Sequence, residues 1–183
     1  EEYANVLRTL SDHAPAFACL GNHDGGAWAD RKMKIGTSNS QAVRDLLCSA
    51  NIRLLHNEHT VETINGRELN LVGVGDLWNG ECDPNTAFSK LDDSRPTVLL
   101  SHNPDSRDLM RDHPWDLMLC GHTHGGQVYL PGLGAPLAPV KDKKYVRGLH
   151  QFGNRWLHIS KGVGNLHGVR FNCRPEVSLL NVA

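Results

Sequence analysis

Short apolar segments that end in polar, glycine-containing turns recur along the chain. They occupy residues 14–20, 97–100, 117–120 and 155–160. Apolar runs of this length between turn residues are typical of buried strands. A further apolar segment, residues 176–182, is predicted to be a closing strand beside 155–160. The turns after the first three strands are therefore expected at the carboxyl ends of those strands.

Helical and hairpin patterns complete the expected elements. One helical face near the start of the chain consists of Tyr3, Val6, Leu7 and Leu10. A second helix is predicted over residues 38–50, where apolar residues recur at helical spacing. Residues 60–64 and 68–74 flank Asn65-Gly66, the dipeptide typical of a two-residue β-hairpin. We therefore expect an α/β fold in which antiparallel strands lie beside a parallel sheet.

Composition narrows the class of protein. With 183 residues, 39% of them hydrophobic and 21% charged, the chain suits one globular domain. A net charge of -1 gives no broad positive surface, so nucleic acid is not an expected partner. No apolar run approaches a membrane span, and the five widely spaced cysteines lack CxxC pairs, which predicts buried thiols in a cytoplasmic protein.

Side chains that bind metals or transfer protons follow three of the predicted strands. The three turns are GNHD, SHNP and GHTHGGQ, and their candidate residues are Asn22, His23, Asp24, His102, His122 and His124. Each motif alone is as well explained by an ordinary polar turn. Open α/β sheets, however, place ligand sites at the carboxyl ends of strands, and amide oxygens and imidazoles are ligands of divalent ions. Two imidazoles one residue apart point to opposite sides of an extended segment, which favours two neighbouring ions.

The order and wording of these motifs resemble the calcineurin-like metallophosphoesterase superfamily. GHTHGGQ and the Leu-Pro-Gly sequence that follows it are similar to a bacterial phosphodiesterase branch of that superfamily. The resemblance implies two mixed β-sheets packed as a sandwich and flanked by helices. It also implies a first divalent ion on Asn22, His102 and His122, a second ion on His124, and a catalytic role for His23. Mn, Zn, Fe, Ni and Mg all remain open as the metal.

Two motifs of the superfamily are missing before GNHD. Its members bring a DxH and a GDxxD motif from two earlier strands, and these supply further ligands, including the carboxylate that bridges both ions. Asp12-His13 lacks the intervening residue, and Gly75-Asp76 comes after GNHD. We therefore expect residues 1–183 to be the carboxy-terminal portion of a single domain that is truncated at its amino end. This segment alone is expected to bind metals weakly and to catalyse poorly or not at all.

The function that follows from the resemblance is a metal-dependent phosphodiesterase. Two ions roughly 3.5–4 Å apart would activate a bridging hydroxide for in-line attack on the phosphodiester. His23 would assist the leaving group, and Asp24 would set the tautomer of His23. The alternatives are a phosphomonoesterase or nuclease on the same scaffold, or a noncatalytic binding scaffold.

The apolar loop at residues 128–140 bears on the substrate. Three prolines stiffen this loop beside the polar turn, so it suits either a lipid-linked diester or simple packing onto the sheet. A small phosphodiester is the expected partner in both cases. If the diester is lipid-linked, the resemblance implies contact with the inner membrane through the missing amino-terminal segment.

Overall fold

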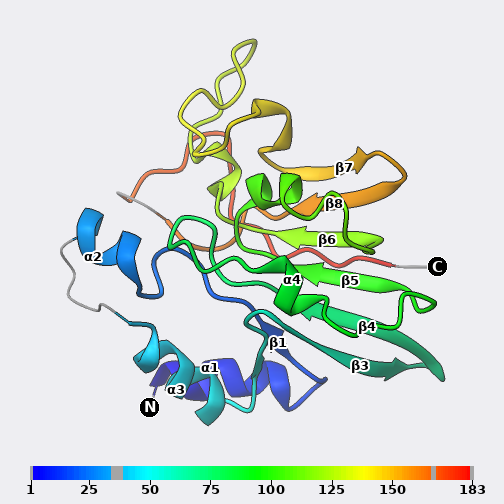
Figure 1. Cartoon of the computed structure of the whole chain (residues 1–183). Coiled ribbons are helices and arrows are strands. Elements are labelled where there is room, and N and C mark those ends of the chain that lie inside the picture. The colour runs from blue at the N-terminus through cyan, green and yellow to red at the C-terminus, as the bar shows by residue number, and fades with distance from the viewer. Residues whose placement is uncertain (1, 34–38, 166–167, 182–183) are drawn as a thin grey trace.

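A six-stranded mixed sheet forms the centre of the protein, as the computed structural model shows for residues 2–33, 39–165 and 168–181 (Figure 1). Its strands, in spatial order, are β3 (Glu58–Ile64), β4 (Arg67–Gly73), β5 (Thr97–Leu100), β6 (Leu117–Cys120), β8 (Arg155–Ile159) and β7 (Gly148–Phe152). The four inner strands are parallel, and the two outer strands run antiparallel to their neighbours. The turns that follow the parallel strands therefore meet at one edge of the sheet.

A second, smaller sheet pairs β1 (Phe17–Ala18) with β2 (Arg53–Leu54) in parallel. Helices α1 (Glu2–Ser11) and α3 (Gln41–Ser49) lie beside it, at the bottom of Figure 1. The remaining helices are α2 (Ala27–Met33), α4 (Pro84–Ala87) and the 3-10 turns Pro104–Asp108, His124–Gly126 and Lys143–Tyr145. The expected α/β class is thus confirmed, with a larger mixed sheet, a smaller parallel sheet and flanking helices.

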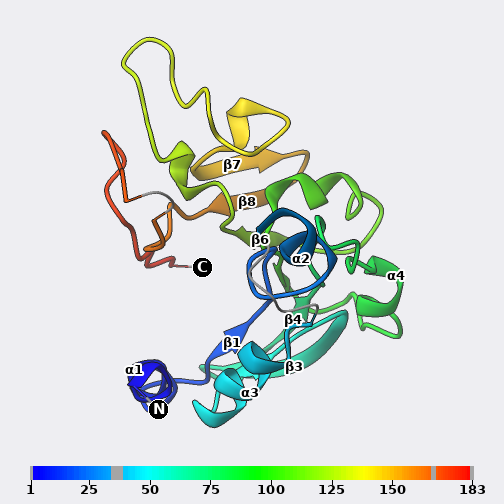
Figure 2. The same cartoon turned by 90° about the vertical axis from the view of Figure 1, so that its left-hand side faces the viewer.

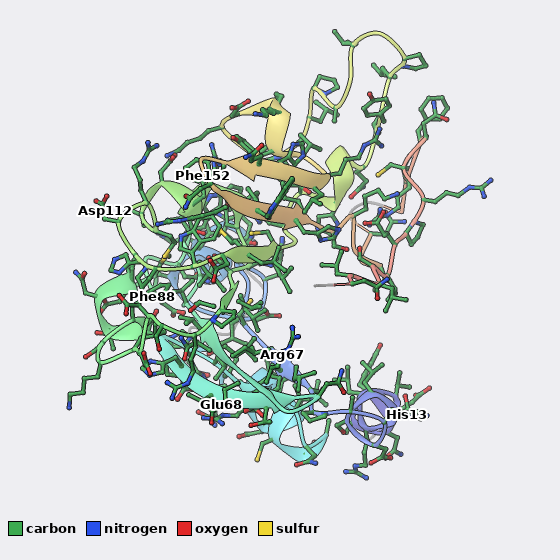
Figure 3. All side chains as sticks on the ribbon, turned by 90° about the vertical axis from the view of Figure 1, so that its right-hand side faces the viewer. His13, Arg67, Glu68, Phe88, Asp112 and Phe152 are labelled. Atoms are coloured by element: carbon green, nitrogen blue, oxygen red, sulfur yellow. The ribbon has the colours of Figure 1, made fainter. Side chains whose placement is uncertain are left out.

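Two apolar clusters hold these parts together. The larger one centres on fully buried Leu99, Met118 and Leu157 from β5, β6 and β8. The smaller one packs Leu20 and Leu47 under α3. Figure 3 labels Phe152 of the edge strand β7 and Glu68 of β4, the strand next to the opposite edge strand β3. The central strands β5 (TVLL) and β6 (LMLC) are short apolar runs in which buried residues alternate with half-buried ones.

The hairpin and the strands β5, β6 and β8 lie where the sequence predicted them, whereas β7 was not predicted. Asn65 (φ 52°) and Gly66 (φ 76°) adopt the left-handed conformations that a type I′ turn requires. None of the described helices is long and apolar enough to cross a membrane. All five cysteines are free, although only Cys120 and Cys173 are buried.

Two expectations were wrong. Residues 176–181 form no strand, and Val177 and Leu179 are 89% and 90% exposed. The reason is that β8 already pairs on both sides, with β6 and with β7, so no edge is left for this segment. The apolar face predicted for the first helix is also largely exposed, because only Leu7 of that face packs against the smaller cluster.

Candidate metal centre

Three donor atoms converge where the smaller sheet meets the larger one. Asn22 Oδ1 lies 3.0 Å from His102 Nε2 and 3.0 Å from His122 Nδ1, and the two nitrogens are 3.2 Å apart. Asn22 and His122 are buried. The sequence-predicted ligands of the first ion thus come together from three separate turns.

This triangle fits one side of a metal site. Donors about 2.1 Å from a common ion in octahedral geometry are about 3.0 Å apart, close to the observed edges. Burial lowers the pKa of His102 to about 3 and the pKa of His122 to about 4. Both imidazoles are therefore neutral near pH 7, the form that binds metals. The described residues hold no group of three or more His, Cys, Asp or Glu placed for a metal, so the candidate ligands here are two imidazoles and one amide.

Strand pairing places the two histidines side by side. β5 and β6 are adjacent and parallel, and the pairing continues past their ends through a 3.0 Å bond from Gly121 N–H to the His102 carbonyl. Gly21 lets Asn22 approach, since a Cβ at residue 21 would lie 2.7 Å from three atoms of the His102 ring. The close approach therefore requires a residue without a side chain at position 21.

His124 occupies a left-handed turn instead of the extended segment that the sequence suggested. The φ angles of His122 and His124 are 66° and 51°. His124 Nδ1 lies 3.2 Å from the Gly164 carbonyl. Burial lowers the pKa of His23, His102 and His122, and repulsion from His124 lowers each of them further. The assignment of His124 to a second ion stays a prediction.

His23 and Asp24 follow Asn22 in the same turn. The exposed His23 ring meets Trp28 edge-on, with centroids 5.1 Å apart. Burial of part of the ring and the charge of His124 lower the pKa of His23, while the carboxylate of Asp24 raises it. Asp24 Oδ2 accepts a 2.7 Å hydrogen bond from Gly21 N–H. Asp24 thus closes the turn and acts on His23 through its charge, whereas its predicted role in setting the tautomer remains a prediction.

The sequence did not reveal the residues that support this turn. The Trp78 ring meets the His122 ring edge-on, with centroids 4.3 Å apart, and its centroid lies 5.2 Å from that of the Trp28 ring. These aromatic rings connect the turn that carries His122 with the turn that carries His23. Buried Asp76 accepts a 2.9 Å bond from Asn79 N–H, and burial raises the pKa of the Asp76 carboxyl to about 6. The only available signal was the polar GDLWN segment after a predicted strand.

A cavity of about 420 Å³ opens beside His124. Val128, Leu137, Pro139 and Val169 form most of its apolar lining, together with the backbone around Gly126. Figure 2 shows the orange-red segment that contains residue 169 beside the yellow-green start of the loop, in agreement with the bridge between Val128 and Phe171. The loop thus lines a cavity next to the candidate metal centre, although Ala135, Ala138 and Val140 pack into the core.

The fold and the three converging turns define a metallophosphoesterase. Residues 1–126 match the family model of the calcineurin-like phosphoesterases, and the chain belongs to this family. It is 48% identical to the phosphodiesterase YaeI of Escherichia coli over 98% of the chain and 63% of that protein.

More distant relatives show the same pattern of coverage. The chain is 28% identical to the UDP-2,3-diacylglucosamine pyrophosphatase LpxG of Chlamydia muridarum, over 96% of the chain and 66% of that protein. It is 29% identical to the uncharacterized metallophosphoesterase YkuE of Bacillus subtilis, over 97% of the chain and 59% of that protein. The chain thus spans about three fifths to two thirds of the length of these relatives. No solved structure matches it.

Proposed function

We propose that the protein is a metal-dependent hydrolase of phosphoric diesters. The observation that carries the proposal is the triangle formed by Asn22 Oδ1, His102 Nε2 and His122 Nδ1. Membership of the calcineurin-like family and the 48% identity to a phosphodiesterase support it. These three residues would hold one divalent ion, and His124 would help to hold a second.

Each candidate residue has its own role in the proposed reaction. Divalent ions, when bound, supply Lewis-acid stabilisation of the charge on the phosphoryl group. His23 donates a proton or a hydrogen bond to the leaving oxygen, because it stands in the same turn as Asn22 but remains exposed. Asp24 counteracts the effects that lower the pKa of His23 and so keeps more of this imidazole protonated.

Hydrolysis of bis-p-nitrophenyl phosphate by the full-length protein tests the proposal. We expect turnover with Mn²⁺, loss of turnover with a chelator, and little turnover in His102→Ala. His150→Ala is the matched control, because His150 lies on β7 and contacts the Arg147 carbonyl. His23→Ala should lower turnover more than metal content. A preference for p-nitrophenyl phosphate would identify a monoesterase instead, and no turnover with metal bound would favour a binding scaffold.

The substrate of this site, in our proposal, is a lipid-linked diester. The apolar cavity beside His124 would accept an acyl chain while the phosphate lies at the metal centre. The name of the related LpxG, a pyrophosphatase of a diacylated sugar nucleotide, supports this class of substrate. Such a substrate would place the protein in the cytoplasm at the surface of the inner membrane, which fractionation of cells would test.

Substitutions of two leucines in the loop at residues 128–140 test whether the substrate is a lipid-linked or a small diester. Leu137 lines the cavity, whereas Leu133 does not, although both are exposed. We expect Leu137→Asp to lower kcat/KM for an acylated diester about tenfold and to spare a small aryl diester, while Leu133→Asp changes neither. Equal losses on both substrates would show that Leu137 is structural.

A further inference from the structure

The Arg170 side chain joins three segments of backbone around His124. Its guanidinium group donates hydrogen bonds to five carbonyl oxygens, those of His124, Lys161, Gly162, Gly164 and Cys173. The distances include 2.9 Å from Nη2 to Lys161 and 3.2 Å from Nε to Gly164. Arginine has five N–H donors in a rigid planar fork, so a single side chain can bind several carbonyls at once.

One of these carbonyls is also the partner of the His124 ring. The Gly164 oxygen lies 3.2 Å from His124 Nδ1. A carbonyl oxygen only accepts hydrogen bonds, so this contact requires the proton on Nδ1 and leaves the lone pair on Nε2. The ring also lies close to the backbone of Gly164, because a Cβ added there would be 3.3 Å from its Cε1 atom.

The loop that contains Gly164 is not paired as a strand of either sheet. β8 ends at Ile159, and residues 160–165 contain no helix or strand. Backbone hydrogen bonds hold this loop at Ser160, whose N–H donates to the Cys120 carbonyl, and at Gly162, whose carbonyl accepts from Glu176 N–H. The hydrogen bonds from Arg170 add to these two and also bind the Lys161 and Gly164 carbonyls. Arg170 Nη1 also reaches the carbonyl of His124 itself at 3.4 Å, and Cys173 Sγ lies 3.2 Å from that oxygen. Arg170 thus holds both the backbone of His124 and the acceptor that its ring needs.

We propose that Arg170 is a positioning residue for His124: by fixing the Gly164 carbonyl, it selects the Nδ1–H tautomer and presents Nε2 to a metal ion. The tautomer forms without metal or substrate. The binding of an ion at Nε2 rests on the proposed function, so the two statements are tested separately.

Nitrogen-15 NMR of the imidazole side chains in the metal-free, full-length protein tests the tautomer. The signals of His124 are assigned by their absence from His124→Ala. We expect the parent protein to show a protonated Nδ1 and an unprotonated Nε2. Arg170→Ala should shift both signals toward the Nε2–H form, which free imidazole side chains prefer, while the signals of His150 stay in place. Arg170→Lys keeps the positive charge but loses the planar guanidinium group. We expect this variant to fold like the parent protein, while its His124 signals resemble those of Arg170→Ala.

Arg174→Ala is the matched control, because Arg174 lies on the same segment with its side chain exposed. It should leave the His124 signals unchanged. Titration with Mn²⁺ then measures the affinity for the second ion, the one proposed to bind His124. We expect Arg170→Ala to lower this affinity at least tenfold. Unchanged His124 signals in both Arg170 variants, or equal shifts in Arg174→Ala, would overturn the positioning role. The expected shifts without any hydrolysis by the parent protein would refute the proposed function alone.

Discussion

Asn22 and His102 are 80 positions apart in the sequence, yet the side-chain oxygen of one lies 3.0 Å from Nε2 of the other. Asn22 follows β1 of the smaller sheet, and His102 follows β5 of the larger sheet. The candidate metal centre therefore depends on how the two sheets meet. The close packing of Gly21 against the His102 ring is part of that junction.

Gly21→Ala should displace the His102 ring. The added Cβ would lie 2.7 Å from three ring atoms, so the ring or the turn must move. Overpacking of this kind costs about 1–3 kcal/mol. Metal affinity, measured by titration with Mn²⁺ in the full-length protein, should fall at least about tenfold. Gly121→Ala provides the control, because its Cβ would make an ordinary 3.9 Å contact with the same ring. Equal affinities in the two variants would contradict the prediction.

His122→Ala and His124→Ala should each remove part of the bound metal. His122 Nδ1 belongs to the triangle with Asn22 and His102, whereas His124 contacts Gly164 outside that triangle. The two variants are therefore expected to lose different ions. Elemental analysis after removal of free metal measures the number of ions per chain. Unchanged stoichiometry in both variants would rule out the ligand assignment.

The main features of the candidate site could be predicted because they are local in sequence. Residues 117–120 were predicted to be a strand and form β6, since an apolar run followed by glycine leaves few alternatives. The parallel order of β5 and β6 then brings His102 and His122 together. The left-handed turn at His124 could not be predicted in this way, because it is held by Arg170 and Cys173, 46 and 49 residues away.

Other parts depend on partners that no local pattern reveals. Residues 176–181 have the apolar pattern of a strand, but both edges of β8 are occupied. Similarly, α2 begins where Asn79, 51 residues away, accepts the backbone N–H of Trp28. Periodicity reports which residues prefer burial, whereas the choice of partner is made by the whole fold.

Asp76→Asn should change how stability depends on pH. Burial raises the pKa of Asp76 from 3.8 to about 6, so the folded state favours the protonated carboxyl. Ionising this carboxyl in the folded protein lowers the free energy of unfolding, with an upper limit of about 3 kcal/mol. This loss is absent below about pH 4 and fully present above about pH 6. The free energy of unfolding should therefore rise in the variant relative to the parent protein by about 1–3 kcal/mol between pH 4 and pH 7.

Urea unfolding of the full-length parent and variant at several pH values measures this difference. Asparagine keeps an oxygen that can accept the hydrogen bond from Asn79 N–H, so the comparison isolates the charge. Other titrating groups contribute equally to both proteins and cancel. A difference that stays constant between pH 4 and pH 7 would show that Asp76 is ionised in the folded protein at little cost.

Asn79→Ala should disturb the turn that carries His23. Asn79 Oδ1 accepts the N–H of Trp28 at 2.8 Å, and Asn79 Nδ2 donates to the Gly25 carbonyl at 2.9 Å. The first bond satisfies a free N–H group at the start of α2, and the second holds the residue that follows Asp24. Losing both should lower the free energy of unfolding by about 1–3 kcal/mol.

The catalytic effect of this change follows from the contacts of Trp28. Its ring supports the His23 ring at 5.1 Å, so a displaced α2 would misplace the proposed donor to the leaving oxygen. We expect kcat of Asn79→Ala to fall about tenfold or more while KM and metal content change little, because the ligand triangle does not include Asn79. Asn79→Asp keeps an acceptor for Trp28 but loses the donor to Gly25, so it should fall between the alanine variant and the parent. Asn85→Ala, at an exposed position on α4, serves as the control. A parallel loss of metal in Asn79→Ala would mean that the segment supports Asn22 as well as His23.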